Sequence, residues 1–252
     1  MTVVPGARTP PGTVDLTRGT LRGPCFRAAR GALLALLVPL LRLRIEGMEH
    51  VPRSGPVVVV ANHLHNADPV VLSVAFPRPL HFMTKKEAFA NPFTAAIARR
   101  VGAFPVDRGK ADRGAIRHAE AALAQGIAVG IFPEGTRSVT QALRRAYPGA
   151  ALIALRSGAP VLPVAITGTE WLPFNGSKGR PPRRTSASRT RPPGVRVCFG
   201  PPFVLSREEQ KLSTETATDR IMAEIAALLP AAYRGDYATA GEPHPTTNPA
   251  VG

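Results

Sequence analysis

Apolar and β-branched residues form short runs along this chain, separated by stretches in which apolar positions recur with helical spacing. The four consecutive valines at 57–60, bounded by Pro56 and Asn62, predict a strand over 57–61 that is buried on both faces. Further runs predict strands at 81–84, 104–106, 128–132, 161–166 and 195–199. Helical stretches lie at 92–101, 116–124, 150–157 and 208–229. This alternation predicts an α/β fold with a central, mostly parallel sheet flanked by helices.

The most apolar stretch lies near the N-terminus, at residues 31–41. It is flanked by Arg27, Arg30, Arg42 and Arg44. As a helix, such a run rises about 17 Å, against about 30 Å for the hydrocarbon core of a bilayer. We therefore expect it to lie in a membrane interface without spanning it, with its arginines reaching the lipid headgroups. The alternative is an amphipathic helix packed on the protein's own core, which Pro39 near the end of the run also suits.

Composition and charge restrict the class of partner. The 252 residues, 44% of them hydrophobic, suit one domain with a sizeable core. A net charge of +15 and a pI near 11.3 require an anionic partner, either nucleic acid or lipid. Aromatic residues make up only 6% of the chain, and neither a stacking motif nor zinc-finger spacing occurs. The composition therefore favours an anionic membrane surface over nucleic acid.

The same composition predicts how the chain is organised. Residues 1–23 and 235–252 are rich in Pro, Gly and Thr, which predicts disordered tails. Between them we expect a membrane-associating helical segment at 24–46 and a single domain at 47–234. Within that domain, residues 175–194 are rich in Arg and contain no acidic residue, which predicts a mobile surface loop. This loop could contact lipid, dock an acidic acyl carrier protein, or be a solvated linker, and the sequence leaves these open.

Cysteine and metal-ligand chemistry are not indicated. The chain has two cysteines, Cys25 and Cys198, which fits a reducing cytoplasm better than a disulfide framework. Neither cysteine has the setting of a nucleophile. No metal site is expected, because His63 and His65 have no cluster of further ligands beyond Asp68.

Candidate chemistry begins where the valine strand ends, in Ala-Asn-His-Leu-His-Asn-Ala-Asp-Pro at 61–69. Open parallel sheets build their sites at such strand ends, which places His63 and Asp68 for catalysis. At the start of the following helix, the helix dipole would keep His63 neutral, and Asp68 can fix its tautomer. The alternative is a helix cap, with Asn62 or Asp68 holding backbone amides. His65 could compete as the base, although a solvated or capping histidine is expected there.

Two further turns combine an apolar strand with Gly and Arg. They are Ala-Phe-Pro-Val-Asp-Arg-Gly at 103–109 and Ile-Phe-Pro-Glu-Gly-Thr-Arg-Ser at 131–138. A guanidinium donates two parallel hydrogen bonds to one phosphate, and Gly lets backbone amides approach the same oxygens. Arg108 and Arg137 are therefore phosphate candidates. Glu134 needs a different role, either accepting a hydrogen bond from a substrate hydroxyl or holding Arg137.

In the order and spacing of four blocks, the chain resembles the glycerolipid acyltransferase family, which is marked by Asn-His-x4-Asp and Phe-Pro-Glu-Gly-Thr-Arg-Ser. Residues 62–68 and 132–138 match these two blocks. Residues 102–109 and 161–166 look like the family's second and fourth blocks. The resemblance implies a single acyltransferase domain preceded by a membrane-associating helical segment. It also implies that His63 is the general base, that Asp68 orients it, and that no covalent acyl-enzyme forms.

The resemblance further implies which residues contact the acceptor's glycerol and phosphate. They are Asn62, Arg108, Glu134, Gly135, Thr136, Arg137 and, in the floor of the site, Pro163. The chain departs from the family at Tyr147, near where members often carry a Lys. Arg144 or Arg145 could replace that Lys, but with a different geometry, which leaves the headgroup preference open.

The expected function is that of a membrane-associated O-acyltransferase, peripheral or monotopic, at the cytoplasmic face of the cell membrane. It would move a fatty acyl group from an acyl-CoA or acyl carrier protein thioester to a lysophospholipid, 1-acyl-sn-glycerol-3-phosphate, making phosphatidic acid without a cofactor. One alternative is another acceptor, such as glycerol-3-phosphate or a lyso-aminolipid. Others are a catalytically idle protein that binds membranes through its basic surface, and a nucleic-acid-binding protein.

Overall fold

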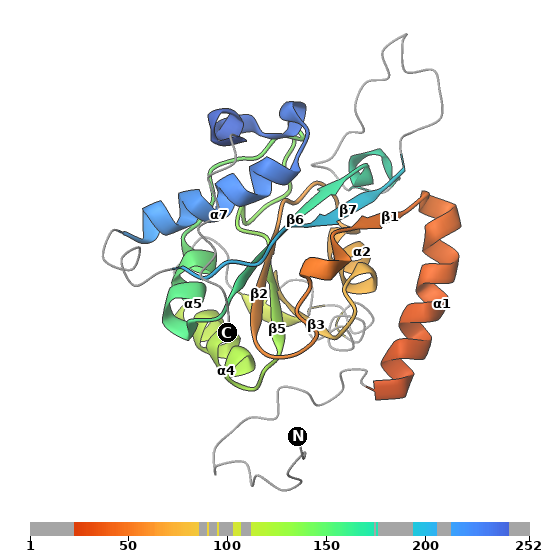
Figure 1. The fold of residues 1–252 in the computed structure, drawn as a ribbon, viewed down its shortest axis with the longest axis horizontal. Helices are drawn as coiled ribbons and strands as arrows, with labels where there is room; N and C mark the ends of the chain where they lie inside the picture. The colour runs from red at the N-terminus through yellow and green to blue at the C-terminus, as the bar shows by residue number, and fades with distance from the viewer. Residues whose placement is uncertain are drawn as a thin grey trace, which may run out of the picture.

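A computed structural model of the chain describes residues 23–85, 90, 95, 103–106, 112–173, 175, 194–205 and 213–241. A seven-stranded sheet in the order β1-β7-β6-β2-β5-β3-β4 forms its centre (Figure 1). The strands are β1 (Arg44–Glu46), β2 (Val57–Ala61), β3 (Leu80–Lys85), β4 (Phe104–Val106), β5 (Ala128–Ile131), β6 (Val161–Thr167) and β7 (Arg196–Phe199). Neighbouring strands pair in parallel except β6 and β7, which are antiparallel. The predicted mostly parallel sheet is therefore confirmed.

β2 lies in the middle of the sheet because its side chains are apolar on both faces. It pairs with β6 on one side and with β5 on the other, and all of its residues are buried. Val57 and Val59 belong to the core layer that contains Phe76, whereas Val58 and Val60 belong to the other core layer. Burial of each valine contributes about 1.5–3 kcal/mol. Burial thus stabilises β2, the strand that precedes the turn containing His63.

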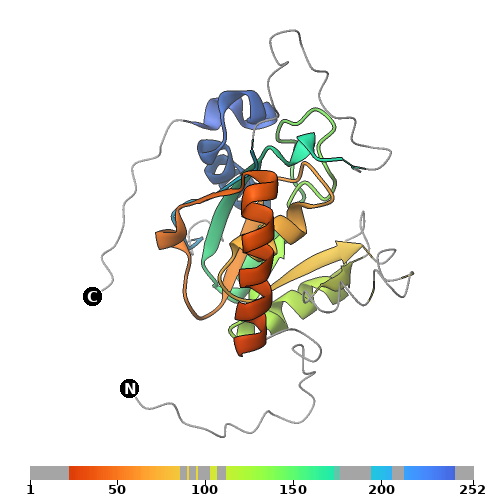
Figure 2. The same cartoon turned by 90° about the vertical axis from the view of Figure 1, so that its right-hand side faces the viewer.

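Helices cover both faces of this sheet (Figures 1 and 2). The core layer of Val58 and Val60 is completed by α4 (Arg113–Ala124), α5 (Gly149–Ser157) and α7 (Thr214–Leu228). The opposite layer is completed by α2 (Asp68–Ala75), against which α1 (Gly23–Leu41) lies. Figure 2 shows α1 on the outside of the molecule, in front of the sheet. The predicted α/β domain with helices on both faces is confirmed.

α7 begins later than the helix predicted at 208–229. Ser213 has an extended backbone, with φ −173° and ψ 159°, and its side-chain oxygen accepts a hydrogen bond from Thr216 N at 3.1 Å. Ser213 therefore caps a helix whose first residue is Thr214. Residues 206–212 lie outside the described residues, as does almost all of the helix predicted at 92–101.

α1 is longer than its apolar pattern predicts. It has 19 residues and continues through Pro39, which gives it a length of about 28 Å. By length and composition it is a candidate for crossing a membrane, so the prediction that the segment is too short to span is wrong. Residues 44–46, which the predicted segment 24–46 includes, pair with β7 as β1. The sheet therefore begins before the predicted boundary at residue 46.

One side of α1 contacts the domain. Leu34, Leu37 and Leu41 pack against the core layer that contains Phe76. Arg30 donates hydrogen bonds from Nε to the backbone oxygen of Phe76, at 2.9 Å, and from Nη2 to that of Ala75, at 3.0 Å. These carbonyls end α2, and a cation is favourable there. Arg30 therefore caps α2, contrary to the prediction that it reaches lipid headgroups.

Residues 235–241, predicted to begin a disordered tail at 235–252, are folded. They form the 3-10 turns of η7 (Gly235–Gly241) against α7, and Tyr237 is buried. Asp236 N donates to the backbone oxygen of Leu143 at 3.2 Å, and Asp236 Oδ2 accepts from Arg145 N at 3.0 Å. These long-range contacts add the turn to the domain. Residues 1–22 and 242–252 lie outside the described residues.

Candidate active site

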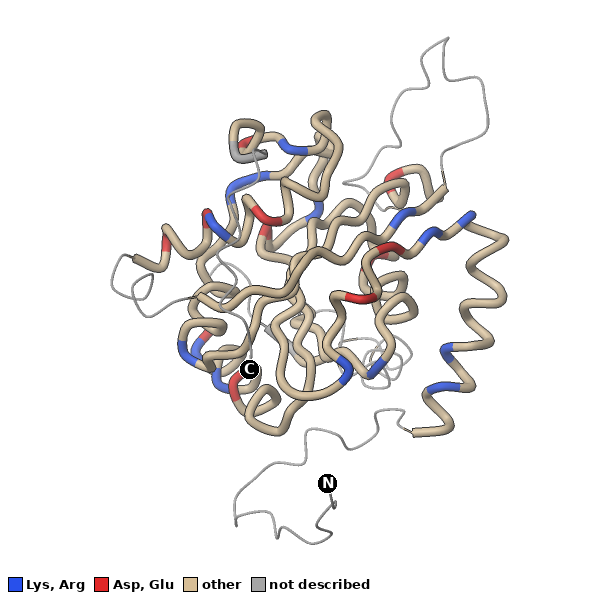
Figure 3. Tube along the Cα trace, in the orientation of Figure 1, with Lys and Arg blue, Asp and Glu red and all other residues tan. Residues whose placement is uncertain are grey.

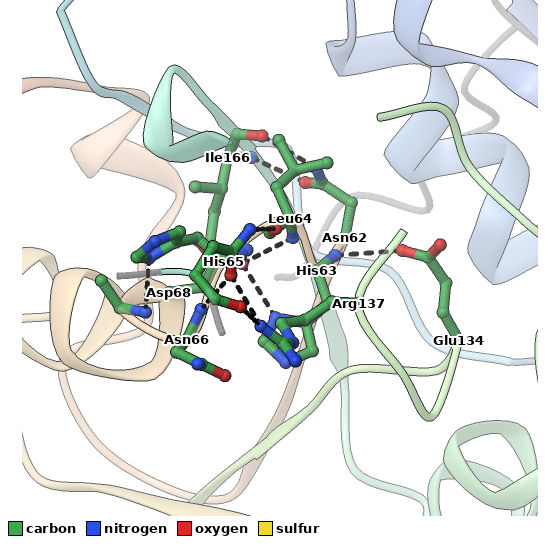
Figure 4. A network of polar contacts seen from close by, with 11 residues as sticks. Asn62, His63, Leu64, His65, Asn66, Asp68, Glu134, Arg137 and Ile166 are labelled. Carbon is green, nitrogen blue, oxygen red and sulfur yellow. Dashed lines mark hydrogen bonds and ion pairs between the residues drawn. The ribbon is translucent and has the colours of Figure 1, made fainter. Parts of the chain in front are cut away.

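Three neighbouring strands bring the candidate site together (Figure 4). β5, β2 and β6 are adjacent and parallel, so their carboxyl ends lie side by side. The turn after β2 contains His63 and Asp68, and the turn after β5 contains Glu134 and Arg137. The segment after β6 reaches Asn175. In α/β sheets this is the edge where sites form.

His63 and Asp68 are in direct contact. His63 Nδ1 lies 2.8 Å from Asp68 Oδ2, and the two side chains are 7% and 0% exposed. Because a carboxylate oxygen only accepts, Nδ1 is the donor in this contact, so in the neutral imidazole the lone pair is on Nε2. Asp68 Oδ2 also accepts hydrogen bonds from the backbone N of Leu64, at 2.6 Å, and of His65, at 2.7 Å. Asp68 thus orients the imidazole and holds the turn, which combines the two roles that the sequence left open.

An aromatic stack fixes the plane of the His63 ring. Phe132, directly after β5, stacks on His63 with ring centroids 4.3 Å apart and an interplanar angle of 23°. Phe82 of β3 stacks in turn on Phe132, at 5.8 Å. Such pairs are worth about 0.5–1.5 kcal/mol beyond the area they bury. The sequence does not indicate Phe132 as a neighbour of His63, because only strand pairing brings β5 next to β2.

α2 begins at Asp68, so the prediction that its dipole acts on His63 is wrong. The dipole acts within the first turn of a helix, and His63 precedes that turn. The neighbouring histidine, His65, caps the turn, because its Nδ1 accepts a hydrogen bond from Ala67 N at 3.0 Å. The ring is buried, and burial lowers its pKa. His65 is therefore a buried cap of the turn, and the solvated alternative is wrong.

Glu134 joins the turns that follow β2 and β5. Its Oε1 accepts a hydrogen bond from His63 N at 3.0 Å, and its Oε2 accepts one from Arg144 N at 3.2 Å. Burial raises the pKa of the carboxyl to about 7, against the opposing effect of these hydrogen bonds and of the Arg144 charge. Arg137 bonds elsewhere, so the alternative in which Glu134 holds Arg137 is wrong. Contact with a substrate hydroxyl stays a prediction.

Gly135 and Tyr147 lie against each other in the turn after β5. Gly135 has φ +65°, and a Cβ at this position would lie 2.8 Å from the Tyr147 ring. Glycine is therefore required both for the backbone conformation and for the approach of the ring. Tyr147 N donates to the backbone oxygen of Pro133 at 2.9 Å, and Thr136 beside Gly135 is half-buried. The departure at Tyr147 thus lies on the turn that the resemblance assigns to the acceptor.

Arg137 is held by a residue that the sequence did not single out. Its Nη1 donates to the backbone oxygen of Asn175 and, at 2.8 Å, to Asn175 Oδ1. Asn175 is 7% exposed, so the predicted surface loop 175–194 begins with a buried residue. Residues 176–193 lie outside the described residues. An Asn followed by Gly is typical of a turn, so the sequence contains no signal for this contact.

Asn62 and Pro163 both contact the strands below the candidate site. Asn62 Nδ2 donates to the backbone oxygen of Ile166 at 2.8 Å, and Asn62 Oδ1 accepts from Ile166 N at 2.7 Å. This buried amide therefore ties β2 to β6, and its predicted contact with substrate stays a prediction. Pro163 lies inside β6, in register with Val60. Its ring packs beside Gly200, below the edge that carries His63.

The sequence offers three more arginines as possible phosphate ligands, Arg108, Arg144 and Arg145. Arg108 lies outside the described residues, so its phosphate contact stays a prediction. Arg144 lies close to Glu134, whose pKa its charge lowers. Arg145 is bonded through its backbone N to Asp236. Arg144 is therefore the better placed of the two to replace the missing Lys.

Across the described residues, no group of three or more His, Cys, Asp or Glu side chains could hold a metal ion.

Comparison with known proteins agrees with this geometry. A family model described as "Acyltransferase" matches residues 42–167, half of the chain, including both turns. The chain is 32% identical over 145 residues to the 1-acyl-sn-glycerol-3-phosphate acyltransferase of Bacillus subtilis (strain 168), covering 57% of this chain and 71% of that protein. It is 29% identical over 153 residues to the protein of the same name from Escherichia coli (strain K12), covering 59% and 62%.

A solved structure shares the fold. The crystal structure of the 1-acyl-sn-glycerophosphate (LPA) acyltransferase from Thermotoga maritima matches with a TM-score of 0.54 and 26% identity. The match covers 77% of this chain and 79% of that one. The family resemblance of the four sequence blocks is thereby confirmed. The chain belongs to the acyltransferase family and is an enzyme of that family.

Proposed function

We propose that the protein is a membrane-associated O-acyltransferase that makes phosphatidic acid. The acyl donor is an acyl-CoA or acyl carrier protein thioester, and the acceptor is 1-acyl-sn-glycerol-3-phosphate. The observation that carries the proposal is the buried His63–Asp68 pair beside the turn of Arg137. Acylation of a phosphorylated alcohol needs a base and a nearby anion-binding group. The names of the relatives support the same acceptor.

The proposed reaction uses His63 as a proton carrier. Asp68 holds the proton on Nδ1, so Nε2 takes the proton from the acceptor hydroxyl as its oxygen attacks the thioester carbonyl. The tetrahedral intermediate then collapses, the carbon–sulfur bond breaks, and the thiolate takes the proton from the imidazolium. A thioester is electrophilic enough for direct attack, so the scheme needs no covalent acyl-enzyme and no cofactor.

Two arginines are proposed to hold the acceptor phosphate. Arg137 lies on the turn after β5, next to the catalytic turn after β2. Arg144 is exposed and lies close to Glu134, which itself holds His63 through the backbone. A phosphate between the two guanidiniums would place the glycerol part of the acceptor near His63. Gly135 and Thr136 would form the wall between them.

The exposed side of α1 supports a membrane setting. It includes Leu33, Leu36, Val38 and Leu40, which are 41% to 67% exposed. Arginines occur at the two ends of the helix, and Figure 3 shows no acidic residue along it. Apolar side chains with flanking cations suit a helix that lies in one leaflet. We infer peripheral or monotopic attachment at the cytoplasmic face, where the lipid acceptor would meet the thioester donor.

A panel of donors and acceptors tests the proposal. Labelled acyl-CoA and, separately, the acyl carrier protein thioester are incubated with 1-acylglycerol-3-phosphate, glycerol-3-phosphate and a lyso-aminolipid. We expect label in phosphatidic acid, and His63→Ala should lower turnover by about 10²–10⁴-fold, the usual contribution of a general base. Near-UV circular dichroism of the variant controls for folding. Turnover close to that of the wild type would remove His63 from the mechanism.

The same panel separates the alternatives. A different acceptor, glycerol-3-phosphate or a lyso-aminolipid, is favoured by the Tyr147 ring packed on Gly135, because it replaces a cation with an aromatic side chain. Label in one of those products would support it. No label from any pair, with folded protein that binds anionic vesicles, would favour the idle membrane-binding protein.

A further inference from the structure

We propose that Asn175 is a positioning residue of the acyltransferase site, which ties Arg137 to the turn that contains His63. The inference rests on the proposed function, because it takes Arg137 as the ligand of the acceptor phosphate. Asn175 lies after the segment 42–167 that matches the family model. It is also the first residue of the predicted surface loop, so neither pattern assigns it a role.

The contacts of Asn175 reach the turns after β2 and β5. Its Nδ2 donates to the backbone oxygen of Leu64 at 3.0 Å, and its Oδ1 accepts from Asn66 N at 3.3 Å. Both partners lie between His63 and Asp68. Oδ1 and the backbone oxygen also accept hydrogen bonds from Arg137 Nη1. One buried side chain therefore links the ends of β2, β5 and β6.

The geometry at Arg137 leaves a defined edge for a ligand. A guanidinium has five N–H groups, two on each terminal nitrogen and one on Nε. Nη1 donates to two oxygens of Asn175, which accounts for both of its N–H groups. The pair of parallel N–H groups on Nε and Nη2 is the edge that binds a phosphate in bidentate fashion. Asn175 thus turns Arg137 so that this edge is kept for the acceptor.

Asn175 also sets the distance between the proposed base and the proposed phosphate site. The turn around Leu64 is held from one side by Asp68, through Leu64 N and His65 N. Asn175 holds the same turn from the other side, through Leu64 O. His63 and Arg137 are therefore fixed relative to each other through Asn175. Precise placement of reacting groups is worth orders of magnitude in rate, and a fixed spacing favours acceptors of one length.

Asn175→Ala tests the proposal through the acceptor. It removes three side-chain hydrogen bonds and leaves the backbone oxygen, so we expect KM for 1-acylglycerol-3-phosphate to rise by about tenfold, the size of one charge-assisted bond. KM for the thioester donor should not change. Val139→Ala, an exposed truncation near Arg137, is the matched control and should leave every parameter unchanged.

A double-mutant cycle distinguishes positioning from a general structural effect. If Asn175 acts through Arg137, the double variant of Asn175→Ala and Arg137→Ala should have the same acceptor KM as Arg137→Ala alone. Additive losses, or equal losses for donor and acceptor, would overturn the proposal. Binding of 1-acylglycerol-3-phosphate in micelles, measured calorimetrically on the His63→Ala background, provides a readout without turnover. Weaker binding after Asn175→Ala is expected there, and unchanged binding would also overturn it.

Failure of this proposal differs from failure of the proposed function. If the wild type makes phosphatidic acid and Asn175→Ala behaves like Val139→Ala, the function stands and Asn175 has no positioning role. If the wild type transfers no acyl group to any acceptor, the proposed function fails. The binding arm then decides alone whether Asn175 supports a phosphate site at Arg137.

Discussion

Glu134 shows how one buried side chain can set the position of the proposed base, His63, which it contacts only through the backbone. Its carboxyl accepts the backbone N–H of His63 on one oxygen and that of Arg144 on the other. The group is 3% exposed, and this burial raises its pKa from 4.5 to about 7. Near neutral pH the junction between the two turns is therefore partly protonated.

The free energy of unfolding should depend on pH because of the Glu134 carboxyl. Below pH 4.5 Glu134 is protonated in both the folded and the unfolded protein. Between pH 4.5 and about 7 the folded protein keeps a proton that the unfolded chain has lost, so the free energy of unfolding falls as pH rises. Above pH 7 no further loss is expected. The total loss is about 3 kcal/mol, because each tenfold difference in proton affinity between the two states corresponds to about 1.4 kcal/mol.

Glu134→Gln provides the comparison, because its amide cannot ionise. Gln leaves one backbone N–H without an acceptor, a pH-independent cost of about 1 kcal/mol. Urea denaturation from about pH 4 to 8, which brackets both pKa values, should therefore show a wild-type stability that falls relative to the variant as pH rises. Parallel curves for the two proteins would show that Glu134 does not retain its proton in the folded state.

Among the secondary-structure elements, α1 has two stripes with opposite environments. Leu34, Leu37 and Leu41 pack on the domain, and Arg30 caps α2. Leu36 and Leu40 belong to the other stripe and are 58% and 67% exposed. The packed side agrees with the alternative in which the helix covers the core, and the exposed side is available for the proposed contact with lipid. A helix held along one side suits in-plane attachment better than crossing the bilayer.

Replacing the exposed stripe should weaken membrane binding without unfolding the domain. Leucine burial contributes about 1.5–3 kcal/mol for each side chain, so Leu36→Gln with Leu40→Gln should weaken binding to anionic vesicles by at least about 100-fold. Vesicle sedimentation measures this, and the melting temperature should not change. Val204→Gln, also at an exposed apolar residue, is the control. Equal binding by both variants and wild type would show that this face does not contact lipid.

At the scale of the whole molecule, the C-terminal turn η6 (Ala231–Tyr233) connects segments that lead to the candidate site. Tyr233 OH donates a hydrogen bond to Glu170 Oε1 at 2.6 Å, and Leu143 N donates to the backbone oxygen of Tyr233 at 2.8 Å. Glu170 follows β6, and Leu143 precedes Arg144 in the segment after β5. Burial, together with Glu170, raises the pKa of Tyr233. The segment therefore joins two of the three strand ends that form the site.

Tyr233→Phe should destabilise the protein more than the loss of a single hydroxyl group usually does. Removing the hydroxyl leaves Glu170 Oε1 buried without a donor, which costs about 1–3 kcal/mol. The midpoint of urea denaturation should fall while its slope is unchanged. Tyr147→Phe removes a hydroxyl from a ring that is 61% exposed and should have no such effect. A loss of the same size in both variants would indicate that the Glu170 contact contributes nothing.

Much of this arrangement follows from short stretches of sequence. The valines at 57–60 form β2 because they are apolar on both faces, and the strands at 104–106 and 161–166 form close to where expected. His63 and Asp68 meet because a tight turn brings residues five apart together. Such features depend on neighbours along the chain, so the local pattern contains the information needed to predict them.

The remaining features depend on which segments the fold brings together. Phe132 meets His63, and Asn62 pairs with Ile166, because β2 lies between β5 and β6. Asn175 binds Arg137 from a segment whose composition predicts a loop. Local polarity and spacing are therefore enough to specify the strands and the contact between His63 and Asp68. The contacts that hold them are specified only in the folded chain, because hydrogen bonds between strand ends form between residues that are far apart in the sequence.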